Sequence, residues 1–166
     1  LTSGTTWHAA GLIRGVLYTK NLTQLAQYSL GLYPQLEKET GQATGLKQVG
    51  SISIATNAER WEEIRRSASA ARAFGAEMQE LTPKQAQDMW PLMQIDDVVG
   101  AIHFPQDGQV NPADTTMALA KGARMGGATI LEGIKVTDVL TKDGRAVGVR
   151  TDQGDVTAQI VVNCAG

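Results

Sequence analysis

The amino-acid sequence predicts a mixed α/β or α+β fold, in which helices are combined with short antiparallel strands. The first 127 residues contain two kinds of pattern. Some segments have apolar side chains at every third or fourth position, which is the spacing of an amphipathic helix, and others alternate apolar and polar side chains as a strand does. After Gly127 the helical spacing stops, and short apolar runs separated by Asp-Gly and Gln-Gly pairs indicate β-hairpins. A mixture of helices and antiparallel hairpins is typical of these fold classes.

Small side chains dominate residues 1–19, which show no sustained spacing and are predicted to form a loop with one helical turn near residues 8–12. A helix is expected next, ended by Gly41 and kinked at Pro34. Its predicted buried face repeats every three or four residues: Leu22, Leu25, Ser29, Leu32 and Leu36.

Two further helices are indicated by their capping residues. An alternating strand at 50–57 ends at Asn57, which is expected to cap a helix that stops at Gly75. The face of this helix is predicted to hold Trp61, Ile64, Ala68, Ala71 and Phe74. Thr82, followed by proline, should open a short helix that reaches about residue 90.

The segment after residue 100 begins with a predicted strand at 101–104 and a turn at Asp107 and Gly108. Asn111, again followed by proline, should open a helix that closes at Gly126. Its predicted face holds Met117, Leu119, Ala120 and Ala123. Four short strands are then expected at 130–131, 136–140, 146–151 and 156–163, with hairpin turns at Asp143-Gly144 and Gln153-Gly154.

The composition sets limits on the function. Hydrophobic residues make up 42% of the chain and charged residues 19%, as in folded globular proteins. A net charge of -2 favours neither nucleic acid nor an anionic membrane as a partner, and no apolar run reaches the length of a membrane-spanning helix. The single cysteine, Cys164, allows no internal disulfide and no cysteine-built metal site, so we expect a buried, inert thiol and no metal.

The segment LTSGTTWHAAGL at the start of the chain contains the residues best suited to chemistry. Gly4, Thr5 and Thr6 have small side chains, so their backbone can approach a flat or anionic ligand closely. Trp7 and His8 then place a large ring beside a nucleophilic imidazole. These residue types also fit an ordinary structured loop with one histidine, and composition does not decide between the two interpretations.

The same segment resembles part of a known protein family. The string SGTTWHAAGL is similar to the flavin-attachment segment of the dimethylglycine and sarcosine dehydrogenases, which belong to the D-amino-acid-oxidase-like superfamily of FAD-dependent oxidoreductases. The resemblance continues through GSISIAT, the PLM segment at 91–93, DGQVNP and the final VNCAG. It implies a partial FAD-binding domain of the glutathione-reductase-like type, formed by a flavin-attachment loop at 1–19 and a returning segment at 111–166, and part of an antiparallel-sheet substrate domain at 20–110.

The same resemblance implies roles for individual residues. His8 matches the residue that is joined to the 8α-methyl group of FAD, and the backbone of Val136 matches the position that meets the adenine. The loop that wraps the isoalloxazine and pyrophosphate is matched by Gly4, Thr5, Thr6, Trp7, Ala9, Ala10, Gly11 and Leu12.

Two other side chains are candidates on chemical grounds alone. His103 lies at a predicted strand end, where an imidazole could act on a proton in a substrate cavity. A core histidine bonded to the backbone is the alternative. Arg14 could hold a substrate carboxylate through its planar guanidinium, or could be an ordinary solvated surface residue.

The family resemblance implies oxidation of dimethylglycine or sarcosine by hydride transfer to a covalent FAD, with an electron-transfer flavoprotein or oxygen as the acceptor. It also implies a tetrahydrofolate site in a further C-terminal domain, and work in the bacterial cytoplasm or alternatively in the mitochondrial matrix. No G-x-G-x-x-G motif occurs here, so the Gly-rich dinucleotide turn is expected before residue 1 and further strands after residue 166. A noncovalent amino-acid oxidase and a non-catalytic fragment or binding module are the alternatives.

Overall fold

The computed structural model describes residues 1–17 and 19–165; Tyr18 and Gly166, the last residue of the VNCAG ending, lie outside the described residues. By its internal contacts the chain divides into two units, Leu1–Gly127 and Ala128–Gly166, each of which is described by itself. Helices and antiparallel sheets occur together, which confirms the predicted fold class. The assignment of 1–19, 20–110 and 111–166 to FAD-binding and substrate parts stays a prediction.

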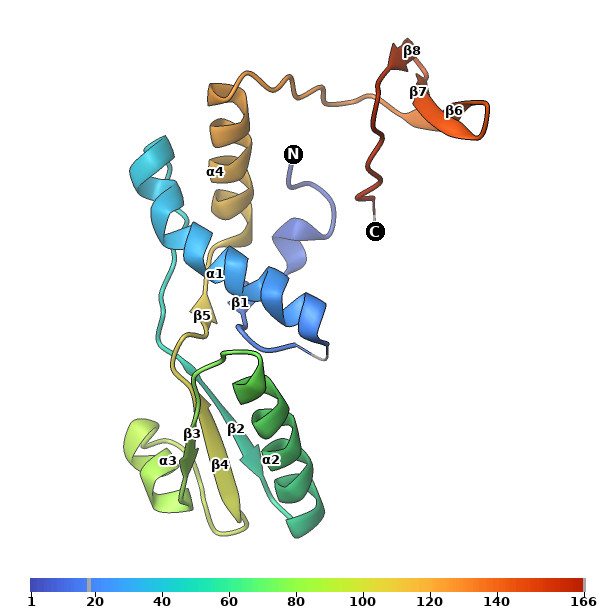
Figure 1. Cartoon of the computed structure of the whole chain (residues 1–166). Coiled ribbons are helices and arrows are strands. Elements are labelled where there is room, and N and C mark those ends of the chain that lie inside the picture. The colour runs from blue at the N-terminus through green and yellow to red at the C-terminus, as the bar shows by residue number, and fades with distance from the viewer. Residues whose placement is uncertain (18, 166) are drawn as a thin grey trace. The chain divides into compact units, whose positions relative to one another are not determined.

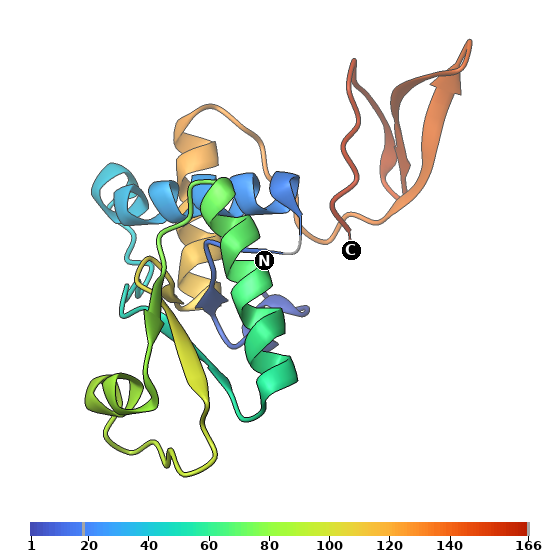
Figure 2. The same ribbon diagram turned by 60° about the horizontal axis from the view of Figure 1, so that its bottom comes forward.

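A three-stranded antiparallel sheet forms the centre of one half of the first unit. Its strands are β2 (Ser51–Ala55), β4 (Gly100–Phe104) and β3 (Gln79–Leu81), in the order β2-β4-β3. Two helices, α2 (Ala58–Ala73) and α3 (Pro83–Met89), lie on opposite faces of this sheet (Figures 1 and 2).

The alternation of side chains along β4 explains how one strand serves both helices. Ile102 is fully buried with Ala55, Ile64 and Ala68 in a cluster against α2. Its neighbour Ala101 points to the other face and packs with Ala86 and Met93 beside α3. The sheet is therefore buried on both sides, and its two faces have different surroundings.

The other half of the first unit is built on helices. The long helix α1 (Lys20–Thr40) crosses α4 (Pro112–Met125), as both views show (Figures 1 and 2). The short strands β1 (Leu12–Ile13) and β5 (Gly108–Gln109) pair antiparallel, and the 3₁₀ turn η1 (Thr6–His8) packs on α4.

The helix ends predicted from capping residues agree with the structure in most cases. The side chains of Asn57, Thr82 and Asn111 each accept a hydrogen bond from a backbone N–H in the first turn of α2, α3 and α4. At Thr82 the bond is reciprocal, because Gln85 accepts from the backbone N–H of Thr82. Gly41 ends α1 in the left-handed conformation, with φ of 67°.

The predicted faces of α1 and α4 were partly wrong. Leu22 and Leu25 are 45% and 63% exposed, and in α4 both Met117 and Leu119 are 41% exposed. Leu36 and Ala120 are buried as predicted, and the other buried positions are Thr23, Leu30 and Thr40 in α1, and Thr115 and Ala118 in α4. The buried side chains of α4 are small, which allows α1 to pack close to it.

The helical turn predicted near residues 8–12 is also wrong, because the structure has η1 and β1 in this part of the chain.

The second unit is a three-stranded meander of β6 (Val136–Lys142), β7 (Arg145–Thr151) and β8 (Gly154–Thr157). Asp143 and Gly144, with φ of 50° and 75°, form the two-residue turn expected between β6 and β7. The strand predicted at 130–131 and the last part of the one predicted at 156–163 are not strands, because neither pairs with a neighbour in the described part of this unit. Cys164 is exposed, which corrects the expectation of a buried thiol.

Candidate functional site

The loop at residues 1–12, called here the His8 loop, presents a pair of stacked rings to solvent. The backbone N–H of His8 donates to the carbonyl of Thr5 at 3.2 Å, and that of Ala9 donates to Thr6 at 3.1 Å, which closes the tight turn η1. The ring centroids of Trp7 and His8 lie 4.2 Å apart, and Trp7 is 62% exposed. The His8 imidazole is exposed and makes no hydrogen bond within the described residues, so its nitrogens are accessible.

Gly11 fixes the end of the His8 loop against β5. Its carbonyl accepts a hydrogen bond of 2.8 Å from the backbone N–H of Val110, and the ladder between Leu12 and Gln109 continues the pairing. Gly11 has φ of 74°, and a Cβ there would lie 2.1 Å from the carbonyl oxygen of Val110. Only glycine can bring the two backbones this close.

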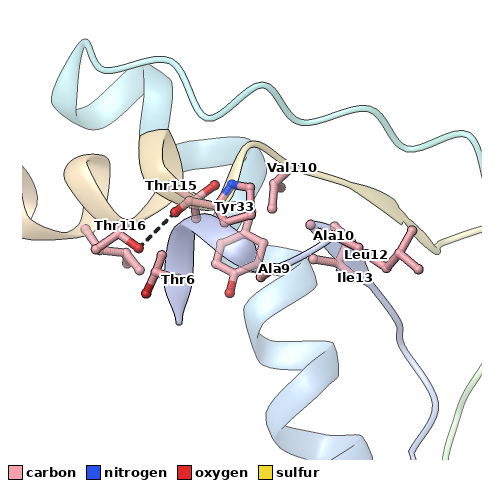
Figure 3. A pocket seen from close by; sticks show the side chains of 12 residues that line it. Thr6, Ala9, Ala10, Leu12, Ile13, Tyr33, Val110, Thr115 and Thr116 are labelled. Carbon is pink, nitrogen blue, oxygen red and sulfur yellow. Dashed lines mark hydrogen bonds between the residues drawn. The ribbon is translucent and has the colours of Figure 1, made fainter. Parts of the chain in front are cut away.

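The loop forms one wall of a pocket of about 440 Å³, a volume in the range of small-molecule sites (Figure 3). Ala9, Ala10 and Leu12 contribute from the loop, Tyr33 from α1 and Thr116 from α4. The Thr116 hydroxyl is occupied within its own helix, where it donates to the carbonyl of Pro112 at 2.9 Å. The remaining side chains that line the pocket are mainly apolar, which suits the edge of a flat ring system.

The other residues that the resemblance singles out, Gly4, Thr5, Thr6 and Val136, differ in exposure. Gly4 has no heavy atom within 4 Å of an added Cβ, so the backbone there is open to approach. Thr5 is exposed and Thr6 half-buried. Val136 begins β6 in the second unit, pairs with Thr151 and is 55% exposed. The flavin contacts expected for these residues stay predictions.

His103 is half-buried in β4, on the face that α3 covers. Its Nδ1 is buried and has no hydrogen-bond partner, which contradicts the alternative of a core histidine held through that atom by the backbone. Its Nε2 packs close to Gly50, where a Cβ would lie 2.4 Å away. The structure does not bring His103 together with the His8 loop.

A second cavity, of about 420 Å³, opens on the α2 side of the sheet. It is lined by Arg14, Ser53, Phe104, Ile64 and Phe74 among others, and so joins the segment after β1 to α2 and the sheet. At its edge Arg60 and Glu63 form an ion pair of 2.7 Å. The cavity thus combines apolar side chains with polar and charged ones, so it could hold a ligand that has both kinds of group.

Asp107 is a residue whose role the sequence did not reveal. Its carboxylate is 4% exposed; Oδ1 accepts from the backbone N–H of Gly15 at 2.8 Å, and Oδ2 accepts from the Ser51 hydroxyl at 2.6 Å. The Asp-Gly pair indicates only a turn, because the partners of the carboxylate lie far away in the sequence. Asp107 and Arg14 both line a smaller cavity of about 100 Å³ next to the second one.

Comparisons with known proteins identify the family of the chain. The family model described as "FAD dependent oxidoreductase" matches residues 1–166. Human mitochondrial sarcosine dehydrogenase is 39% identical over 172 residues, and mitochondrial dimethylglycine dehydrogenase of Rattus norvegicus is 37% identical over 166 residues. The mitochondrial pyruvate dehydrogenase phosphatase regulatory subunit of Mus musculus is also 37% identical over 166 residues. Each alignment covers 100% of this chain and 19% of the relative.

A solved structure shares the fold. L-proline dehydrogenase from P. horikoshii superposes with a TM-score of 0.87 at 28% sequence identity, covering 98% of this chain and 43% of that one. The fold is thus that of a flavin-dependent oxidoreductase. The chain belongs to the FAD-dependent oxidoreductase family, in which it resembles the sarcosine and dimethylglycine dehydrogenases, and it spans about a fifth of the length of these relatives.

No group of three or more His, Cys, Asp or Glu side chains that could hold a metal ion occurs in residues 1–17 and 19–165. Within the same residues, no helix has the length and apolar character needed to span a bilayer.

Proposed function

We propose that the whole protein containing this chain oxidises an N-methylated glycine, either sarcosine or dimethylglycine, with an FAD joined covalently to His8. The observation that carries this proposal is the exposed His8 imidazole, which lies beside Trp7 in a loop of small side chains. The similarity of the whole chain to relatives named sarcosine and dimethylglycine dehydrogenase supports the substrate class.

The chemistry of His8 fits the proposed bond. A neutral imidazole nitrogen is a nucleophile, so it suits attachment to the 8α-methyl carbon of the flavin. Ala9, Ala10 and Gly11 add little bulk next to the imidazole, which leaves room for a flat ring system. A covalent link would prevent loss of the cofactor, while the surrounding side chains supply its orientation.

The bound flavin would supply an acceptor for hydride. The N-methyl carbon of the neutral amine would be the source of this hydride, and the resulting iminium would release its one-carbon unit to water or to tetrahydrofolate held elsewhere in the whole protein. The expected acceptor of the two electrons is an electron-transfer flavoprotein or oxygen.

The part proposed for the chain's own residues is to bind and orient the reactants. The His8 loop would hold the flavin, and the cavity on the α2 side of the sheet would hold the amine. A proton-transfer role for His103 stays a prediction, and its ring lies on the opposite face of the sheet from that cavity. The site of action, bacterial cytoplasm or mitochondrial matrix, also stays a prediction, and the names of the mitochondrial relatives favour a mitochondrial location.

Acid precipitation of the full-length protein tests the covalent link. The precipitate should stay yellow, and mass spectrometry should find the flavin on the peptide that contains His8. His8→Ala should leave only dissociable FAD, whereas His103→Gln, which changes the only other histidine of the chain, should keep the covalent flavin. An unmodified His8 peptide in fully active enzyme would contradict the proposal and favour a noncovalent oxidase.

A regulatory protein without turnover is the second candidate, and the 37% identity to a phosphatase regulatory subunit favours it. Anaerobic mixing with substrate separates the two. Sarcosine or dimethylglycine should bleach the flavin absorbance, faster as the pH rises through the titration of the amine, because only the neutral amine has the lone pair that expels hydride. A flavin that no N-methylated amino acid reduces would favour the regulatory role, and bleaching by an ordinary D-amino acid alone would favour an amino-acid oxidase.

A further inference from the structure

The indole of Trp7 is the ring that contacts the His8 imidazole. The two ring centroids lie 4.2 Å apart, with an angle of 39° between the ring planes. Within residues 1–17 and 19–165 the imidazole makes no hydrogen bond, and neither ring is among the side chains that line the pocket of about 440 Å³. The contact with Trp7 therefore limits the rotation of an imidazole that is otherwise open to solvent.

The backbone of both residues is held in the tight turn η1. The N–H of His8 donates to the carbonyl of Thr5 at 3.2 Å, and the N–H of Ala9 donates to the carbonyl of Thr6 at 3.1 Å. Because the backbone is fixed there, the freedom that remains to His8 is the rotation of its side chain. This freedom has an entropic cost whenever the ring must adopt a single orientation.

The geometry of the ring pair leaves the imidazole nitrogens free. The lone pair and the N–H of a neutral imidazole point outward in the plane of the ring, whereas the indole lies against one face of it. Two aromatic rings in such a contact attract each other. Trp7 thus restrains the imidazole without blocking the atom that reacts.

Trp7 is not part of the core of the first unit. Its side chain is 62% exposed, and the turn η1 contains no buried residue. A substitution at Trp7 therefore removes the contact with His8 and leaves the buried clusters of the sheet intact. The effect of the indole on His8 is for this reason open to measurement.

We infer that Trp7 is a positioning residue for flavin attachment, because its indole holds the His8 imidazole in the orientation from which a ring nitrogen reaches the 8α carbon. This inference rests on the proposed function. A nucleophile that is held in its reactive orientation forms the bond faster, since fewer of its rotamers are unproductive. Trp7 acts through His8 and takes no part in the bond itself.

The step that Trp7 assists joins an imidazole nitrogen to the 8α carbon. The nitrogen supplies the electron pair of the new bond. One proton of the 8α-methyl group and the proton of the imidazole N–H pass to the flavin ring system, which is thereby reduced by two electrons. Dissolved oxygen then takes up these two electrons and two protons as hydrogen peroxide, and the flavin returns to its oxidised state.

The test uses full-length protein produced in riboflavin-starved cells, so that His8 carries no flavin at the start. After FAD is added, samples are precipitated with acid, and the acid-stable flavin gives the rate of attachment. At saturating FAD this rate should fall about 2-fold to 12-fold in Trp7→Leu, the range expected for loss of one aromatic pair, and Trp7→Phe should recover part of it. Trp90→Leu is the matched control, because Trp90 is 56% exposed but contacts no histidine ring within the described residues, and its rate should equal that of the wild type.

Two further readouts separate positioning from other roles of Trp7. If Trp7 served only as a binding surface for the flavin, Trp7→Leu would raise the FAD concentration at half-maximal rate and leave the limiting rate unchanged, which would overturn the inference. Carbethoxylation of His8 by diethylpyrocarbonate, followed by mass spectrometry, reports the nucleophilicity and exposure of the imidazole without flavin. It should be no slower in Trp7→Leu than in the wild type, and a decrease that matches the decrease in attachment rate would also overturn the inference.

The inference and the proposed function fail in different ways. Attachment of flavin to His8 at the same rate in the wild type and in Trp7→Leu would overturn the inference and leave the covalent link standing. Wild-type protein that gains no acid-stable flavin would contradict the proposed covalent link, and the inference with it.

Discussion

Replacing Gly11 by alanine should open the contact between the His8 loop and β5. The added Cβ would lie 2.1 Å from the carbonyl oxygen of Val110, a distance that no relaxed structure keeps. An L side chain at φ of 74° adds backbone strain. The two backbones must therefore separate, which breaks the 2.8 Å hydrogen bond from the N–H of Val110. Together the strain and the lost hydrogen bond should cost about 2–4 kcal/mol.

Hydrogen exchange measures this cost where it arises. A loss of about 2–4 kcal/mol of local stability raises the exchange rate of the Val110 amide about 30-fold to 800-fold. Gly4→Ala is the matched control, because a Cβ at Gly4 meets no atom within 4 Å, so its effect should be small. Exchange of Val110 at the wild-type rate in Gly11→Ala would refute the requirement for glycine at this close approach.

Three further predictions concern other parts of the structure. Asp107→Ala should destabilise the whole protein by about 2–5 kcal/mol because it leaves buried donors unpaired, and Asp107→Asn should cost less; thermal unfolding measures both. The hydrogen bond with Arg150 lowers the pKa of Asp155 from its usual 3.8 and raises the pKa of Arg150. The pair should therefore support the β7–β8 hairpin above the usual carboxyl range and release it as the pH falls through the lowered pKa of Asp155, and Asp155→Asn should remove this acid dependence of hairpin amide exchange. Expressed alone, residues 1–166 should bind FAD only weakly and oxidise no amine, since they contain no Gly-rich turn to hold the pyrophosphate. Micromolar binding of FAD in a fluorescence titration, together with amine-dependent dye reduction, would contradict this prediction.

Features that depend on neighbours in the sequence could be predicted from the sequence. The helix caps at Asn57, Thr82 and Asn111 act within three residues, and the Asp143-Gly144 turn needs only two residues that tolerate positive φ. The resemblance of the His8 loop was equally local, because it rests on one continuous string of residues. Its family assignment was confirmed by the match over the whole chain.

Features that depend on distant contacts were decided only by the tertiary structure. The apolar stripe of α1 predicted burial of Leu22 and Leu25, yet both are exposed, because the face that α4 covers is set by how the helices cross and not by the α1 sequence. The bond between Gly15 and Asp107 joins residues 92 positions apart, and no local pattern marks such a pair. From the sequence, a solvated surface residue was the favoured interpretation of Arg14, and a carboxylate ligand was the alternative. Its side chain is exposed, and it lines a cavity together with Arg60, which pairs with Glu63. Which side chains share a cavity is decided by folding, because Arg14 and Arg60 are far apart in the sequence.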